Sequence, residues 1–162
     1  MKVMDRLKDD RGATSYVLML VVMMVATVLL SFSLEFFQAF ALRDKVKLAI
    51  ERAGNMAVSI SMRDDYRIER LHTLDPDMAR NEFLEYIATS LDLSGAYPGF
   101  VYNGDGLNYE LRFSEIAITE TPPRIRSSAE ISVSPITSAW WIPEGMVINL
   151  PVSTETRNIR LD

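Results

Sequence analysis

The sequence predicts an α+β protein in which a long N-terminal helix is followed by a short helix and an antiparallel β-sheet. Three observations predict this layout: an uncharged apolar run of helical length, a helix start at Asp75-Pro76, and strict apolar alternation after residue 106. A leader and an apolar helix take up about 35 of the 162 residues. The remainder is long enough for one small domain.

The apolar run covers residues 13–34 and contains no charged side chain. A helix of that length rises about 33 Å, enough to cross the hydrocarbon core of a bilayer. We therefore predict a transmembrane helix at 13–34, in contact with membrane lipid, after a cytoplasmic leader at residues 1–12. A short basic flank is typical of the cytoplasmic side. The basic residues of this leader are Lys2, Arg6, Lys8 and Arg11. The chain is then a single-pass protein of the cell membrane with an extracytoplasmic C-terminal domain.

Residues 35–62 are predicted to continue the same helix as a stem, because Gly54 is the only helix-weakening residue before Met62. Apolar side chains recur there at spacings of four and three, which places them on one helical face. This helix-packing stripe consists of Leu42, Val46, Ala49, Ala53, Met56 and Ile60. Packing on the outer domain is the interpretation we favour, and contact with neighbouring subunits is the alternative.

Residues 63–162 are predicted to form the extracytoplasmic α+β domain, which begins with a charged, irregular segment at 63–75. Asp75 is a typical N-cap for a helix that has Pro76 at its first position. This helix is amphipathic and ends before Ser94-Gly95. Its apolar positions are Ala79, Phe83, Tyr86, Ile87 and Leu91.

The last third of the chain predicts strands. Residues 107, 109, 111 and 113 alternate as a half-buried strand requires, and the Asn103-Gly-Asp-Gly turn before them predicts a hairpin with residues 100–102. Further strands are predicted at 129–133 and 146–152, separated by loops at Pro122-Pro123 and Pro143. Pro151 predicts that the last strand lies at a sheet edge or ends there.

Composition argues against several function classes. The chain has no cysteine and one histidine, His72, so it offers neither thiolate chemistry nor a multi-histidine metal site. Residues 35–162 hold 13 Lys and Arg against 19 Asp and Glu, a net charge of −6 that argues against binding nucleic acid. We expect no cofactor, no metal site and no enzymatic activity.

Two features of the outer domain have both a structural and a functional interpretation. The segment Asn103–Glu110 spaces its oxygen-bearing side chains loosely like a calcium loop, although a hairpin turn explains every one of its residues. Trp140-Trp141 fits an exposed recognition patch, and it fits equally well as a cap on a small core.

The junction Arg11-Gly12-Ala13 ends the leader directly before the apolar run. From Arg11 to Met62 the chain resembles the N-terminus of TadE-like, pseudopilin-like subunits of the tight-adherence (Flp-type) pilus machinery, which begin with a similar R-G-A junction. The resemblance implies a pilin-like fold and cleavage after Gly12 by a prepilin peptidase, which leaves Ala13 as the new N-terminus. It also implies other pilin-like subunits and pilus assembly proteins as partners.

One position departs from the family pattern. Most type IV pilins carry a glutamate five residues after the cut, where it is thought to pair with the terminal amine of a neighbouring subunit, and here that position is Val17. The departure favours a minor subunit or an assembly component. The next acid, Glu35, is expected to mark the outer edge of the bilayer beside Phe36 and Phe37.

The sequence therefore predicts a structural minor pilin-like or pseudopilin-like membrane subunit of a Tad/Flp-type pilus or secretion apparatus. Small polar residues in the apolar run would allow close approach and hydrogen bonds between helices: Ser15, Thr27, Ser31 and Ser33. One alternative is an unprocessed single-pass anchor for an extracytoplasmic binding domain. Another is a secreted protein released at Ala39-Phe40-Ala41, which we disfavour because signal-peptide cores span only about 7–15 apolar residues.

Overall fold

A computed structural model describes residues 3–61, 74–104, 108–134 and 147–157, with the backbone alone at residues 3–14 and 157. The chain divides into two units, Met1–Gln38 and Ala39–Asp162. Helix α1 (Val3–Ile60) supplies the described part of the first unit and, from Ala39, the first element of the second. The helix therefore begins earlier than the predicted residue 13, because the leader residues also adopt helical backbone.

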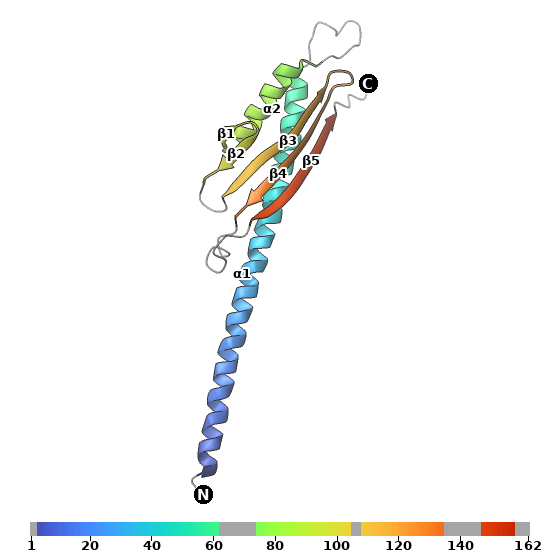
Figure 1. Cartoon of the computed structure of the whole chain (residues 1–162). Coiled ribbons are helices and arrows are strands. Elements are labelled where there is room, and N and C mark those ends of the chain that lie inside the picture. The colour runs from blue at the N-terminus through green and yellow to red at the C-terminus, as the bar shows by residue number, and fades with distance from the viewer. Residues whose placement is uncertain (1–2, 62–73, 105–107, 135–146, 158–162) are drawn as a thin grey trace. The chain divides into compact units, whose positions relative to one another are not determined.

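The second unit is an α+β domain with a five-stranded antiparallel sheet in the order β1-β2-β3-β4-β5. Its remaining elements are α2 (Pro76–Ser90), β1 (Ser94–Ala96), β2 (Gly99–Tyr102), β3 (Tyr109–Thr119), β4 (Arg124–Val133) and β5 (Ile148–Arg157). Figure 1 shows each strand beside its neighbour in sequence. Such a meander needs only short connections between antiparallel strands.

Both helices of this unit cover the same face of the sheet. One core contains Val46 and Ile50 from α1, Phe83 from α2, and Leu111 and Ile131 from the strands. Buried and exposed positions alternate along β4, so its other face meets solvent, as expected for an antiparallel sheet covered on one side. The ring of Phe113 contacts Phe83 and Phe100 edge-on, with centroids 5.9 and 6.1 Å apart, and so joins α2 to the sheet.

The predicted start of the short helix is confirmed. The Asp75 side chain accepts hydrogen bonds from the backbone N–H groups of Asp77 and Met78, both at 3.1 Å, and Pro76 is the first helical residue. These bonds satisfy two of the donors that a helix N-terminus leaves unpaired.

The predicted hairpin is also confirmed, since β2 pairs with β3 in a register that sets Phe100 opposite Leu111. The strands run further than the sequence predicted, to Thr119 in β3 and back to Arg124 in β4. A register shift between Phe113 and Glu115 breaks the alternation there, which hides the second half of β3 from a pattern search. Pro151 lies on the edge strand β5, as predicted.

The helix-packing stripe is correct at its beginning and wrong at its end. Val46, Ala49 and Ala53 are buried and Leu42 packs against the core, whereas Met56 and Ile60 are 46% and 44% exposed. The five spacings of the stripe add up to 18 residues, which is five full turns of an α-helix, so the stripe stays on one side of the helix. The buried face instead continues through the residues Ile50, Gly54, Ala57 and Ser61.

Helix α1 comes close to the sheet at Gly54. A Cβ atom added to Gly54 would collide with Oγ1 of Thr156 in β5 and would lie 2.9 Å from its Cβ. Beside this contact, the buried hydroxyls of Ser127 and Thr154 pair with each other at 2.8 Å, so this polar patch under the helix is satisfied. Gly54 weakens the helix intrinsically, and the structure needs it for this close approach.

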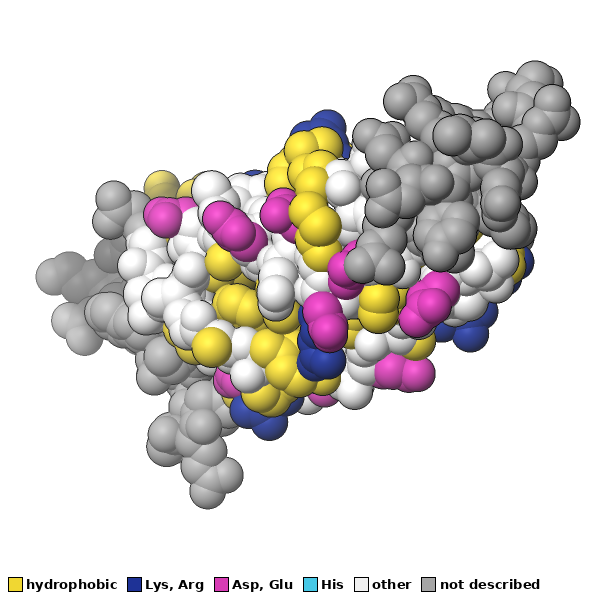
Figure 2. All heavy atoms as spheres, turned by 90° about the horizontal axis from the view of Figure 1, so that it is seen from above, with side chains coloured by type: hydrophobic (Ala, Val, Ile, Leu, Met, Phe, Trp, Pro, Cys, Tyr) yellow, Lys and Arg dark blue, Asp and Glu magenta, His cyan; other side chains and the backbone are white. Residues whose placement is uncertain are grey.

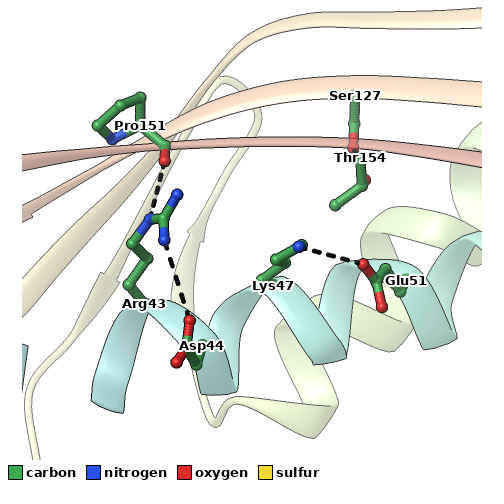
Figure 3. Close-up of polar contacts among 7 residues, drawn as sticks. All are labelled: Arg43, Asp44, Lys47, Glu51, Ser127, Pro151 and Thr154. Carbon is green, nitrogen blue, oxygen red and sulfur yellow. Dashed lines mark hydrogen bonds and ion pairs between the residues drawn. The ribbon is translucent and has the colours of Figure 1, made fainter. Parts of the chain in front are cut away.

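The edge strand is also fastened to α1 by a side chain. Arg43 Nε donates a hydrogen bond to the carbonyl oxygen of Pro151 at 3.2 Å, and one turn further on Lys47 lies 3.9 Å from Glu51 (Figure 3). The ion pair is exposed, so it adds little stability. The Arg43 bond links residues 108 positions apart and fixes where the helix crosses the strand.

The close approach at Gly54 yields a stability prediction. Replacing Gly54→Ala should lower the free energy of unfolding by about 1–3 kcal/mol, because overpacking against Thr156 outweighs the higher helix propensity of alanine. The measurement is urea unfolding of the full chain in detergent micelles. Asn55→Ala, on the exposed side of the same turn, should change stability by less than about 0.5 kcal/mol. If Gly54→Ala were stabilising, the close approach would be absent.

Candidate functional site: the exposed apolar segment of helix α1

The structure describes the side chains of residues 15–38 in the first unit. They point outward from α1, and no other described part of the protein covers them. Tyr16, Leu20 and Leu30 are 73%, 67% and 65% exposed. Within the described residues, one helix is long and apolar enough to cross a membrane. Its most apolar 18-residue window has a mean hydropathy of 2.7 and is not buried at all. Soluble proteins rarely expose a contiguous apolar surface of this size, and such a surface marks a site of contact with protein or membrane.

Three hydroxyl groups in this segment bond to their own helix. Thr27 Oγ1 donates to the Met23 carbonyl at 2.9 Å, Ser31 Oγ to Thr27 at 3.0 Å, and Ser33 Oγ to Leu29 at 2.9 Å. Each bond reaches back four residues, a pattern common for hydroxyls in apolar helices. The three donors are therefore satisfied without a second helix, which lowers the free energy needed to place them in lipid.

The exposed apolar segment ends among three phenylalanines that follow Glu35. Phe37 and Phe40 are 72% and 56% exposed, Phe36 is 41% exposed, and Glu35 is partly buried. The first fully buried apolar residue of α1 in the described side chains is Ala39, at the start of the second unit. The exposed apolar segment thus ends where the packed domain begins.

Gly12 and Ala13 lie within the helical backbone of α1. Glycine inside a helix weakens it by about 1 kcal/mol relative to alanine, since its backbone loses more freedom on ordering. The junction is therefore a weak point of the helix.

Four residues that the sequence analysis singled out lie outside the described residues: His72, Asp105, Trp140 and Trp141. Within the residues that are described, no group of three or more His, Cys, Asp or Glu side chains could hold a metal ion. Figure 2 shows acidic side chains scattered among apolar and uncharged atoms on the face it presents.

One ionisable group of the core has a shifted pKa. Tyr109 is 5% exposed and stacks on Tyr102, with ring centroids 5.1 Å apart. Burial, with a smaller contribution from Tyr102, raises the pKa of Tyr109 from 10.0 to about 12. Its phenol is thus held neutral in the folded domain.

The sequence analysis missed one cluster on the exposed face of the sheet. Glu155 of β5 lies between two arginines of β4: its Oε2 is 3.1 Å from Arg126 Nη2, and its Oε1 is 3.6 Å from Arg124 Nη1. These three side chains line a surface hollow of about 210 Å³ together with Ala117 and Thr119 of β3. The sequence signal was the alternation Arg124-Ile-Arg126, which places both arginines on one face of a strand.

Comparisons of this chain with family models, with curated proteins and with solved structures find no match.

The shifted pKa of Tyr109 predicts a pH dependence of stability. The unfolded tyrosine ionises near pH 10 and the folded one near pH 12, so its contribution is complete below pH 10 and is lost as the pH rises toward 12. Between pH 9 and 11, wild type should lose about 1 kcal/mol more of unfolding free energy than Tyr109→Phe.

The measurement is urea unfolding followed by circular dichroism at both pH values. Tyr97→Phe is the control, since Tyr97 is 38% exposed, and it should keep the wild-type pH dependence. Equal losses in wild type and Tyr109→Phe would contradict the assignment.

Proposed function

We propose that this chain is a structural, non-catalytic, pilin-like membrane subunit of a Tad/Flp-type pilus or secretion apparatus. In this proposal a prepilin peptidase cuts after Gly12, and the outer domain faces away from the cytoplasm. The partners are other pilin-like subunits, pilus assembly proteins and membrane lipid. The observation that carries the proposal is the exposed apolar segment of α1, which has membrane-spanning length and follows directly after a charged leader.

The contribution of α1 to the core of the second unit supports this assignment. From Ala39 the same helix becomes part of the domain core, with Val46 and Ala53 fully buried. An ordinary anchor needs only a linker between the membrane and its domain. Here the helix that carries the apolar segment is also indispensable to the fold, as expected of a subunit that is built around its N-terminal helix.

The junction supports processing. Gly12 weakens α1 between the leader and the apolar segment, which favours local opening of the backbone for a protease. Removal of residues 1–12 would take away the charged side chains that precede the apolar run, so that Ala13 with its terminal amine begins a stretch of helix without charged side chains. Such a segment can move from lipid to a packed assembly of similar helices with little change in its surroundings.

Val17 favours a second candidate function. A valine at this position cannot pair with the terminal amine of a neighbour, so the chain can instead remain in the membrane as an unprocessed anchor for a binding domain. Cleavage after Gly12 distinguishes this candidate from the leading proposal.

Co-expression with a prepilin peptidase tests the processing step. The intact mass of the purified wild-type chain should fall by that of residues 1–12, and Gly12→Ala should keep its full mass because a methyl group obstructs the cut. Ser15→Ala, three residues beyond the junction, serves as the matched control and should be cut like the wild type. An uncut wild-type chain, in cells that process a known prepilin, would support the unprocessed anchor.

Cysteine labelling tests the orientation. The chain has no native cysteine, so Lys8→Cys and Ser153→Cys each introduce one reactive thiol. The experiment uses cells that lack a prepilin peptidase, so that the leader with residue 8 is retained. Ser153 is exposed on the edge strand, so a membrane-impermeant maleimide added to intact cells or spheroplasts should label Ser153→Cys and leave Lys8→Cys unlabelled until lysis. The opposite pattern would place the outer domain in the cytoplasm and overturn the proposed topology.

A further inference from the structure

The hollow on the exposed face of the sheet is formed by the register of three strands. Ala117, Arg126 and Glu155 stand opposite one another in one row across β3, β4 and β5, and Thr119 and Arg124 stand in the adjoining row. Ala117 carries only a methyl group, so the space above it stays open while the longer side chains form the walls. The resulting volume of about 210 Å³ is lined by these five residues.

The charge of the hollow is opposite to that of the domain around it. Arg124 and Arg126 carry two positive charges against the single negative charge of Glu155, whereas residues 35–162 together carry a net charge of −6. Two guanidinium groups sharing one carboxylate leave one positive charge uncompensated among these three side chains. One monoanionic group would neutralise it, since opposite charges at this range attract.

The unused donors of the two arginines show where an anion would bind. Nη1 of Arg124 and Nη2 of Arg126 face Glu155, whereas Nε of Arg124 is buried and out of reach of a ligand. A guanidinium has five N–H donors, so both arginines keep Nη donors that these ion pairs do not occupy. Hydrogen bonds from such charged donors to a carboxylate are among the stronger ones in proteins.

We propose that this hollow binds the carboxylate of an acidic ligand, held by the Nη N–H groups of Arg124 and Arg126 that Glu155 does not use. Ligands of two origins share this chemistry, a free carboxylic acid and an acidic side chain of a peptide. A doubly charged phosphate fits less well, because Glu155 repels the second charge. The site lies on the sheet face opposite the helices and does not depend on the pilin-like assignment.

Nuclear magnetic resonance of the arginine Nε–H groups tests the site in the full chain in detergent micelles at constant ionic strength. Acetate and the blocked peptide acetyl-Gly-Glu-Gly-amide are the two probes. Both should shift the Arg124 signal saturably, while Arg112, an exposed arginine paired with Glu110 on the same sheet face, should not respond. Equal affinities for the two probes would indicate a site for free acids, and tighter binding of the peptide a site for acidic segments. An unsaturable shift, or the same shift at Arg112, would overturn the proposal.

Variants separate binding from general charge effects. Arg124→Gln should weaken binding roughly tenfold, the effect expected from losing a charged hydrogen bond, and Arg112→Gln should leave it unchanged. Glu155→Gln should instead strengthen binding, because it removes the competing carboxylate. Circular dichroism verifies that each variant is folded. If Arg124→Gln does not fold, the affinity of Glu155→Gln for the two probes is the test. Unchanged or weaker binding by that variant would reject the site.

Discussion

The packing of the last turns of α1 on the sheet is the interaction on which the outer domain depends. A five-stranded sheet with one apolar face must bury that face, and within the described residues α1 and the short α2 are the helices that do so. The contact is made largely by small residues, Ala49, Ala53, Gly54 and Ala57. Small residues bring helix and sheet close together, which increases the number of atoms in contact but leaves little tolerance for added volume.

Much of this architecture could be predicted from local patterns. The apolar run, the Asp75 cap and the hairpin before Tyr109 each depend on residues close in sequence, so each can be recognised without tertiary information. The second half of β3 could not, because the irregularity after Phe113 shifts the alternation. The error at Met56 and Ile60 has a similar cause: spacing identifies an apolar face but not the position of the partner that it meets.

The exposed apolar segment could likewise be predicted from the sequence, and the arginine hollow could not. The exposed apolar segment follows from composition, since the rest of the chain has its own sheet to cover and no surplus with which to bury 22 uncharged residues. The arginine hollow depends on the pairing of Ala117 with Arg126 and of Arg126 with Glu155. The second pairing sets residues 29 positions apart side by side, and neither pairing can be deduced from one strand alone.

The bond from Arg43 to Pro151 has a consequence for how this protein avoids association with itself. An open sheet edge offers backbone donors and acceptors to any extended chain, and long edge strands are common starting points for aggregation. In the middle of β5, Pro151 has no N–H to offer and its carbonyl is already bonded to Arg43. A strand from another molecule can therefore form neither the N–H nor the C=O hydrogen bond at Pro151. The ten-residue edge strand is thus interrupted as a template for pairing.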